Sequence, residues 1–249
     1  RNTKQPMETR NKTIPLDNAR SSTHVDTLSL EKDANGNEYA FVFINAFTKH
    51  TMIFPATDKS AKSFCNALIR YMATMGITDI FIADNGNEFT NEATEILATA
   101  LGTMFTFTIA HRPQANSIVE RVNQTILQEL RIIMTSPEFW NRWSDPYVIA
   151  IVTLSINMRT HTTTGYSPIA LTYGRTTMHY FRQPLDVHLP QHTDLDEADQ
   201  DLKNLQEIAR RNMVQAEQKR LKIQPTAYVT YHTGDLVLRD PITQTGAIR

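Results

Sequence analysis

The chain has 249 residues, of which 41% are hydrophobic and 20% are charged, which excludes an intrinsically disordered protein and is typical of a folded globular one. The net charge of −1 excludes a surface that is basic all round, so any binding of nucleic acid must depend on a local patch. The single cysteine, Cys65, excludes an internal disulfide framework, and the longest apolar stretch, YVIAIVTLSINM, is too short to span a bilayer.

The first predicted elements form an antiparallel meander. Residues 1–21 are polar and lack periodicity, so we expect an extended linker there. THVDTLSLE, residues 23–31, alternates as a half-buried strand does, and the Asn-Gly turn in KDANGNE leads to the apolar strand YAFVFINAF. HTMIFPA predicts a third strand, and the three strands are joined by short turns.

Helices and strands alternate in the next part of the chain. Asp58 is expected to cap a helix from about Lys59 to Met75, and DIFIA, residues 79–83, has the apolar character of a strand buried on both faces. A helix over about 88–101 precedes the predicted strand TMFTFTIA. Long helices over about 117–135 and 143–159 follow, and this order favours a mixed α/β sheet covered by helices.

The C-terminal part differs in composition from this domain. Residues 194–222 predict an amphipathic helix, acidic at its start and basic further on. TAYVTYHTGDLVLRD then alternates as strands do, but about two strands are too little to bury a core, so we expect the start of a small β domain. The predicted division is a linker over 1–21, a core over 22–180, a helical linker over 181–224 and the β segment 225–249.

The predicted strand DIFIA ends at Asp84, which is followed by Asn-Gly and, close behind, Glu88. An aspartate beside Asn-Gly is ordinary turn chemistry, and a turn alone would explain the motif. Two other acids give a second explanation. Asp26 lies inside the first predicted strand, where a charge without a partner is costly, and Glu120 lies near the start of a long predicted helix.

We expect Asp26, Asp84 and Glu120 to converge, because a right-handed crossover makes the first and fourth predicted strands plausible neighbours under that helix. Three carboxylates at one place repel one another unless cations hold them, and hard oxygen ligands suit Mg²⁺ or Mn²⁺. Two such ions can stabilise both the attacking and the leaving oxygen of a phosphoryl transfer. The sequence contains no glycine-rich phosphate loop, no Cys/His zinc spacing and no nucleophile elbow that would indicate another chemistry.

The spacing of the acids makes the pattern specific, because 35 residues separate Asp84 from Glu120. The order Asp26, Asp84, 35 residues, Glu120 resembles the catalytic core of retroviral and LTR-retrotransposon integrases, which are parts of Pol polyproteins. DNGNEFTN and HRPQANSIVERVNQT resemble the family's segments around its second and third acids, and HTTTGYSPIALTYGR is similar to a segment of gypsy-class integrases. The resemblance covers residues 23 to about 175.

This resemblance implies an RNase H-like fold, with a five-stranded mixed sheet flanked by helices, and a polynucleotidyl transferase with a DDE motif. Such an enzyme trims the 3′ ends of double-stranded element DNA, an endonuclease step, and joins them to target DNA. By the same resemblance Asp26 would bridge two Mg²⁺ (or Mn²⁺) ions, Asp84 would hold one and Glu120 the other. Action on DNA in the nucleus, a homo-oligomer and no association with a membrane are also implied.

Five amide side chains near the three acids are candidates for contacting DNA, although a helix cap or a turn would equally explain each of them: Asn85, Gln114, Asn116, Asn123 and Gln124. Ser117 stands where the family usually has glycine, and as a good helix cap it is expected to begin the helix. The resemblance also places the chain between an N-terminal zinc domain and a C-terminal β domain. We therefore expect an internal piece of a longer integrase, with much of the basic surface in the other parts.

There are two alternatives to an integrase. The HRPQ…VERVN segment and the 35-residue gap argue against an RNase H-type nuclease or a cut-and-paste transposase of the same fold. The other alternative is a host-captured integrase domain that binds DNA or a protein without catalysis. All three acids are retained, as catalysis requires, while Ser117 and the near-zero net charge keep the non-catalytic alternative open.

Overall fold

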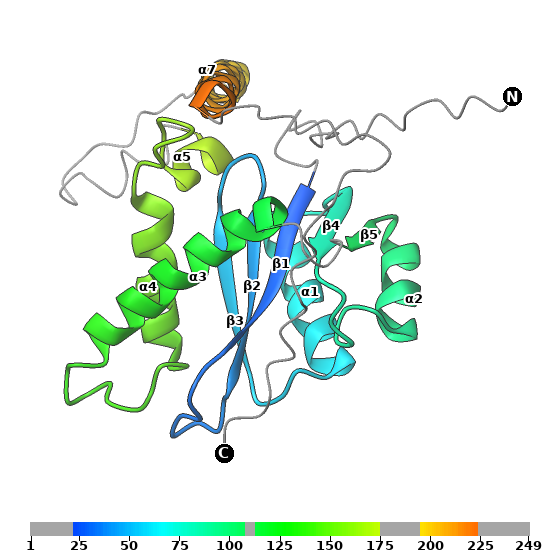
Figure 1. Cartoon of the computed structure of the whole chain (residues 1–249), viewed down its shortest axis with the longest axis vertical. Coiled ribbons are helices and arrows are strands. Elements are labelled where there is room, and N and C mark those ends of the chain that lie inside the picture. The colour runs from blue at the N-terminus through cyan, green and yellow to red at the C-terminus, as the bar shows by residue number, and fades with distance from the viewer. Residues whose placement is uncertain (1–21, 108–112, 175–194, 224–249) are drawn as a thin grey trace, which may run out of the picture.

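Five strands form one mixed sheet in the order β3-β2-β1-β4-β5 (Figure 1). The computed structural model describes residues 22–107, 113–174 and 195–223, without the side chains of 113–118, 195–198 and 220–223. The antiparallel β1, β2 and β3 are followed across the sheet by β4 and β5, which run parallel to β1. The five-stranded mixed sheet is therefore confirmed, with these bounds: β1 Ser22–Ser29, β2 Tyr39–Asn45, β3 Thr51–Ala56, β4 Ile80–Ala83 and β5 Met104–Phe107.

Helices cover both faces of this sheet, and each face has its own hydrophobic core. The four helices are α1 Ala61–Met75, α2 Glu92–Leu101, α3 Pro113–Ile133 and α4 Pro146–Met158 (Figure 1). The core under α1 is aromatic, with the ring of Phe43 stacked on that of Tyr71 at 4.7 Å between centroids. The core under α3 and α4 is mainly aliphatic and contains Val42, Ile126 and Val148.

The alternation of β1 places its residues on the two faces in turn. Val25 packs into the aromatic core and Leu28 into the aliphatic one. Asp26 lies opposite Val42 of β2, so it belongs to the face that α3 covers. The strand predicted from alternation is thus confirmed, and its register directs one carboxylate toward α3.

Four helix starts differ from those predicted, and one of them is that of α4, which begins at Pro146 after the cap Asp145 rather than at about residue 143. The cap of α1 is Ser60, whose side chain accepts a hydrogen bond from Ser63 N, while Asp58 lies outside the helix and accepts hydrogen bonds from Ser60 N and Ser63 Oγ. The prediction that Asp58 caps this helix was therefore wrong, because the side chain of Ser60 is an equally good hydrogen-bond acceptor. The cap of α2 is Asn91 rather than a residue near 88.

The start of α3 at Pro113 also differs from the prediction that Ser117 begins this helix. Proline is favoured in the first turn because its missing N–H would have no helical partner there. Ser117 consequently lies inside α3 and does not cap it.

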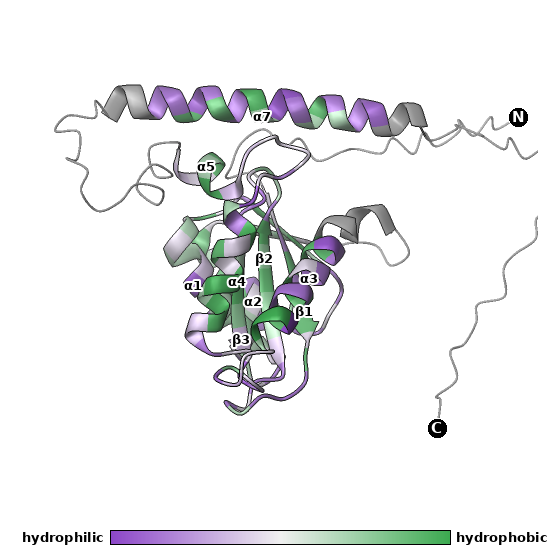
Figure 2. Cartoon of the chain, turned by 90° about the vertical axis from the view of Figure 1, so that its left-hand side faces the viewer, coloured by the Kyte–Doolittle hydropathy of each residue, from purple (hydrophilic) through white to green (hydrophobic). Residues whose placement is uncertain are grey.

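The C-terminal helix packs against the domain end formed by the short helix α5, Pro168–Tyr173 (Figure 2). This helix, α7, covers Leu195–Ile223 and buries Leu205 and Ala209 against Leu171 of α5. Gln206 Nε2 donates a hydrogen bond of 3.0 Å to the carbonyl of Leu171. This contact sets the position of α7 along its own axis. The linker predicted over 1–21 and the β segment predicted over 225–249 lie outside the described residues, so the predicted division stays a prediction.

Within the described ranges, none of the helices combines the length and the apolar character that crossing a bilayer requires.

Candidate active site

Asp26 is held at the centre of the sheet by contacts from two directions. Its carboxylate Oδ2 accepts a hydrogen bond of 2.7 Å from Nδ2 of Asn123 on α3. Burial raises the pKa of Asp26, the backbone N–H of Thr27 and the amide of Asn123 lower it, and the charges of Asp84 and Glu88 raise it again, with a net rise. The side chain is thus a half-buried carboxyl that faces further negative charge.

Asp84 comes beside Asp26 because β4 runs parallel to β1. His24 of β1 lies opposite Ile82 of β4 in the last pair of these two strands, and Asp26 and Asp84 each follow that pair by two residues. Asp84 is exposed just past the end of β4, and its Oδ1 accepts a 2.9 Å hydrogen bond from Gly86 N. Two of the three predicted acids are therefore brought together by the sheet, as the strand order predicted.

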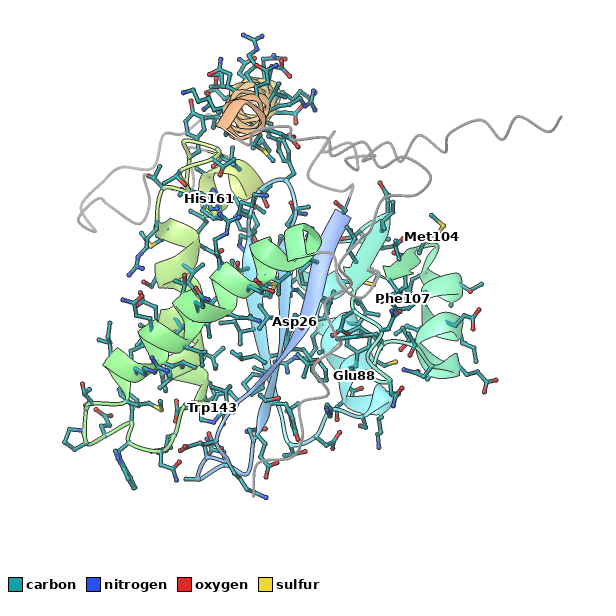
Figure 3. The ribbon with its side chains drawn as sticks, in the orientation of Figure 1. Asp26, Glu88, Met104, Phe107, Trp143 and His161 are labelled. Carbon is teal, nitrogen blue, oxygen red and sulfur yellow. The ribbon has the colours of Figure 1, made fainter. Side chains whose placement is uncertain are left out.

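Glu88 is a further carboxylate beside Asp26 and Asp84, and no role for it was predicted from the sequence. Its Oε1 accepts a 2.9 Å hydrogen bond from the hydroxyl of Thr27, the residue after Asp26. Figure 3 labels Asp26 on β1 and Glu88 on the turn between β4 and α2. The signal available in the sequence was the position of Glu88 four residues after Asp84, across a glycine turn, but the partner Thr27 is distant in the chain.

Glu120 is exposed on α3, one turn before Asn123, the residue that contacts Asp26. Among the residues that the structure describes, no three His, Cys, Asp or Glu side chains lie close enough together to hold a metal ion. The structure thus brings Asp26 and Asp84 together but does not bring Glu120 to them. The convergence of all three acids stays a prediction.

The candidate DNA-contacting amides fall into three groups. Asn123 donates to Asp26, and its own Oδ1 is buried without a hydrogen-bond partner among the described residues. Asn85 and Gln124 are exposed. The side chains of Gln114 and Asn116 lie outside the described part of the chain.

The donor set fits a hard divalent cation. Asp26 and Asp84 present carboxylate oxygens, which Mg²⁺ and Mn²⁺ prefer. Over the described ranges, no Lys or Arg forms an ion pair with Asp26, Asp84 or Glu88. Neighbouring carboxylates without a protein cation would be stabilised by a bound divalent cation, so these residues fit such an ion by their chemistry.

Comparison with known proteins supports the predicted resemblance to integrases. Residues 18–113 match the family model described as an integrase core domain, a range that contains Asp26 and Asp84 and ends before Glu120. Over 155 residues, 61% of this chain, the sequence is 32% identical to a retrovirus-related Pol polyprotein from transposon 412 of Drosophila melanogaster. The chain covers 12% of that polyprotein.

Two solved structures show the fold. A simian T-cell lymphotropic virus intasome in complex with the PP2A regulatory subunit B56 gamma aligns with a TM-score of 0.57 and 15% identity, covering 71% of this chain and 59% of that one. The HTLV-2 integrase catalytic core domain in complex with magnesium, in its trimeric form, aligns with a TM-score of 0.52 and 13% identity, covering 62% of this chain and 97% of that one. The RNase H-like fold predicted from the sequence is therefore confirmed.

Proposed function

We propose that the integrase core domain carried by this chain is a catalytic one, which trims the 3′ ends of element DNA and joins them to target DNA. The resemblance to integrases of retroviruses and retrotransposons is confirmed by the family model and by the Pol polyprotein relatives. The observation that carries the proposal is the meeting of Asp26 and Asp84 where the pairing of β1 with β4 ends in an RNase H-like sheet. Among the described residues, no Lys or Arg forms an ion pair with either carboxylate.

The two reactions of such an enzyme are displacements at phosphorus. In trimming, a water oxygen bonds to phosphorus while the bond from phosphorus to the 3′ oxygen breaks, and that oxygen takes a proton to become the new 3′-hydroxyl. In joining, this hydroxyl loses its proton and bonds to a phosphorus of the target strand, whose own 3′ oxygen leaves. One phosphodiester is broken and one is formed, so no further energy source is required.

Asp26, Asp84 and Glu120 are the residues we assign to Mg²⁺ or Mn²⁺, with two ions as the family resemblance implies. Bound there, the ions supply charge that stabilises the attacking and the leaving oxygen. The magnesium bound to the structurally similar HTLV-2 core supports the choice of ion. Asn123 orients Asp26 through its 2.7 Å hydrogen bond, and the sheet sets the separation of Asp26 from Asp84.

The five candidate amides are proposed to contact DNA beside these acids: Asn85, Gln114, Asn116, Asn123 and Gln124. Asn123 has the most specific support, because its Nδ2 donates to Asp26 and the amide therefore lies beside one of the three acids. The exposure of Asn85 and Gln124 is what contact with a phosphate or sugar requires. The nuclear location expected from the resemblance stays a prediction.

A second copy of the chain is proposed to cover the outer face of α4. Tyr147, Ile151 and Leu154 are 75%, 48% and 43% exposed, and their spacing places them on one stripe of that helix. Figure 2 shows hydrophobic residues along α4, and a helix apolar on all sides usually has partners on all sides. Joining two DNA ends requires two active sites. Self-association is supported by the structural neighbours, one of which is an intasome and another a trimeric form of a core domain.

The test is phosphoryl transfer on a branched DNA that carries a free 3′-hydroxyl beside a target phosphodiester, with Mn²⁺. We expect product from the unmodified chain and none from Glu120→Gln. The matched control is Glu92→Gln, since Glu92 is likewise an exposed glutamate on a helix, in the first turn of α2. If neither the unmodified chain nor the control reacts or binds Mn²⁺, the domain is a non-catalytic relative and the proposal is wrong.

A further inference from the structure

Glu88 connects the two parts of the site, which are the strand that carries Asp26 and the turn that carries Asp84. Thr27, from which the Glu88 carboxylate accepts a hydrogen bond, directly follows Asp26 in β1. A methyl group built at Gly86 would stand 2.7 Å from Glu88 Oε2 and 3.0 Å from Asp84 Oδ1, so these two oxygens flank one small space. The turn therefore folds the side chain of Glu88 back over Gly86 toward Asp84.

Thr27 connects Glu88 with Asp26. Its backbone N–H donates a hydrogen bond to the Asp26 carboxylate, and its hydroxyl donates to Glu88 Oε1 at 2.9 Å. The register of β1 with β4 runs from the pair Ser22–Ile80 to the pair His24–Ile82 and stops there. Beyond that pair, the Glu88–Thr27 hydrogen bond is a side-chain connection between β1 and the turn that follows β4.

The turn itself is closed by short-range hydrogen bonds. Phe89 N and Thr90 N both donate to the carbonyl of Gly86 at 3.0 Å, and Phe89 is buried in the aromatic core. These contacts give the turn its shape and hold it to the α1 side of the sheet. They do not reach β1 beside Asp26, whereas the Glu88–Thr27 hydrogen bond does.

We propose that Glu88 is a positioning residue of the active site, which holds the turn carrying Asp84 against the strand carrying Asp26 through its hydrogen bond with Thr27. This inference rests on the proposed function. A third carboxylate here is unfavourable by its charge, so a contact that stabilises this geometry is needed to offset the repulsion. A charged acceptor provides it, because hydrogen bonds to an ionised carboxylate are stronger than those to a neutral group.

Three variants separate the hydrogen bond from the charge. Thr27→Val removes the hydroxyl, keeps the shape and leaves the N–H that serves Asp26. Glu88→Ala removes the acceptor and the charge, whereas Glu88→Gln removes the charge but keeps an oxygen that Thr27 can reach. Thr57→Val is the matched control, because the hydroxyl of Thr57 also donates to a carboxylate, that of Asp58, at an exposed site.

Each protein is measured in two states. Without metal, backbone hydrogen exchange is followed at Phe89 and Thr90, whose N–H groups close the turn. With metal, Mn²⁺ affinity and the rate of transfer on the branched DNA are measured. We expect Thr27→Val and Glu88→Ala to speed exchange at both amides and to lower affinity and rate by roughly 10- to 100-fold, as loss of a residue supporting a metal ligand does.

The double variant Thr27→Val/Glu88→Ala should lose no more Mn²⁺ affinity or transfer rate than either single variant, since each single variant already removes the same hydrogen bond. Glu88→Gln should recover most of the rate, and Thr57→Val should match the unmodified chain. The inference is overturned if Thr27→Val exchanges and reacts normally, or if Glu88→Gln is as impaired as Glu88→Ala, since Glu88 would then act by charge alone. If the unmodified chain neither binds Mn²⁺ nor reacts, the proposed function is also overturned, whatever hydrogen exchange at Phe89 and Thr90 shows.

Discussion

At the scale of single residues, Gly86 is the position where one methyl group would disturb two carboxylates. An alanine there would meet Glu88 Oε2 at 2.7 Å and Asp84 Oδ1 at 3.0 Å. Both contacts are made by ends of side chains that can move, so the fold should survive while the site does not. We expect Gly86→Ala to lower the transfer rate by about tenfold or more with little change in the midpoint of thermal unfolding. An unchanged rate would show that Glu88 and Asp84 need no defined position.

Asn123 gives a second prediction at this scale. Its amide donates to Asp26 at 2.7 Å, and loss of that donor leaves the carboxylate free to turn. We expect Asn123→Ala to reduce the transfer rate by roughly 10- to 100-fold. Gln128→Ala, an exposed amide on the same helix, is the control that should leave the rate unchanged. Equal rates in the two variants would mean that Asn123 neither orients Asp26 nor contacts DNA.

The site residues differ in how far the sequence could predict them. Asp26 and Asp84 were predictable, because a charge within an apolar strand and a charge at a strand end are both unusual and their spacing is specific to a family. Thr27 and Glu88 were not, since threonine is common in strands and their contact spans 61 positions. The contact depends on the β4 register ending at Ile82, which is a property of the folded sheet.

At the scale of elements, a buried carboxylate fastens the turn between β1 and β2 to the connection between α3 and α4. Asp33 Oδ1 accepts from Asn35 N and Asn37 N, each at 3.0 Å, and its Oδ2 accepts from Ser144 N at 3.0 Å. The amides of Asn35 and Asn37 also donate to Ser144 Oγ. This cluster joins two connections that are 111 positions apart in the chain.

Asp33→Asn should therefore destabilise the fold. The isosteric amide places an NH₂ group where an oxygen accepted hydrogen bonds, so at least one buried backbone donor loses its partner. We expect a loss of about 2–4 kcal/mol in the free energy of unfolding at pH 7, measured by urea denaturation. The exposed Asp79→Asn is the control, and a loss as small as that control's would contradict the structural role of Asp33.

The same group predicts a pH dependence. Burial alone would raise the pKa of Asp33, but hydrogen bonds from Ser144, Asn37 and Asn35 outweigh it and hold the pKa below its ordinary value. A lowered pKa in the folded state means that the stabilisation is complete above the unfolded-state pKa of about 4 and is lost as pH falls through the folded-state value. The stability difference between the unmodified chain and Asp33→Asn should therefore shrink below about pH 4. A difference constant from pH 7 to pH 2 would contradict this.

The elements themselves were largely predictable from the sequence. Alternation in THVDTLS and the apolar run IFIA match β1 and β4. The half-buried position predicted for the first strand was wrong, because β1 is the central strand and most of its residues are buried. Helix starts were less predictable. Near α1 and α2 several Ser, Asp and Asn side chains compete for the cap, and only the local backbone decides which of them accepts the hydrogen bond.

At the scale of the whole molecule, the exposed stripe on α4 predicts self-association. Ile151→Glu places a charge in the middle of that stripe, where a partner would have to desolvate it. We expect the unmodified chain to dimerise or form a larger assembly and this variant to remain monomeric with unchanged stability, measured by sedimentation equilibrium. Ile96→Glu makes the same change at an exposed position on α2 and should not alter assembly. A monomeric unmodified chain would contradict the proposed interface.

The overall arrangement could be predicted as far as the sheet and its covering helices, because strand order follows from the meander and the crossovers. The docking of α7 was not predicted. Its amphipathic pattern indicates an apolar face but not what covers that face, and Leu205 and Ala209 pack on Leu171 of a separate short helix. A methyl group at Gly165, whose φ is +75°, would stand 2.9 Å from Asn212 Nδ2, a contact that composition does not reveal.

The most direct test of the proposed active site is the position of Mn²⁺ in a crystal of this chain, located by its anomalous scattering. We expect an ion with oxygen ligands from Asp26, Asp84 and Glu120, which requires the exposed Glu120 of α3 to turn toward the sheet. Glu88 should remain hydrogen-bonded to Thr27 without touching the ion. An ion held by Asp26, Asp84 and Glu88 with Glu120 still exposed, or no ion at this edge of the sheet, would contradict the assignment of the three acids.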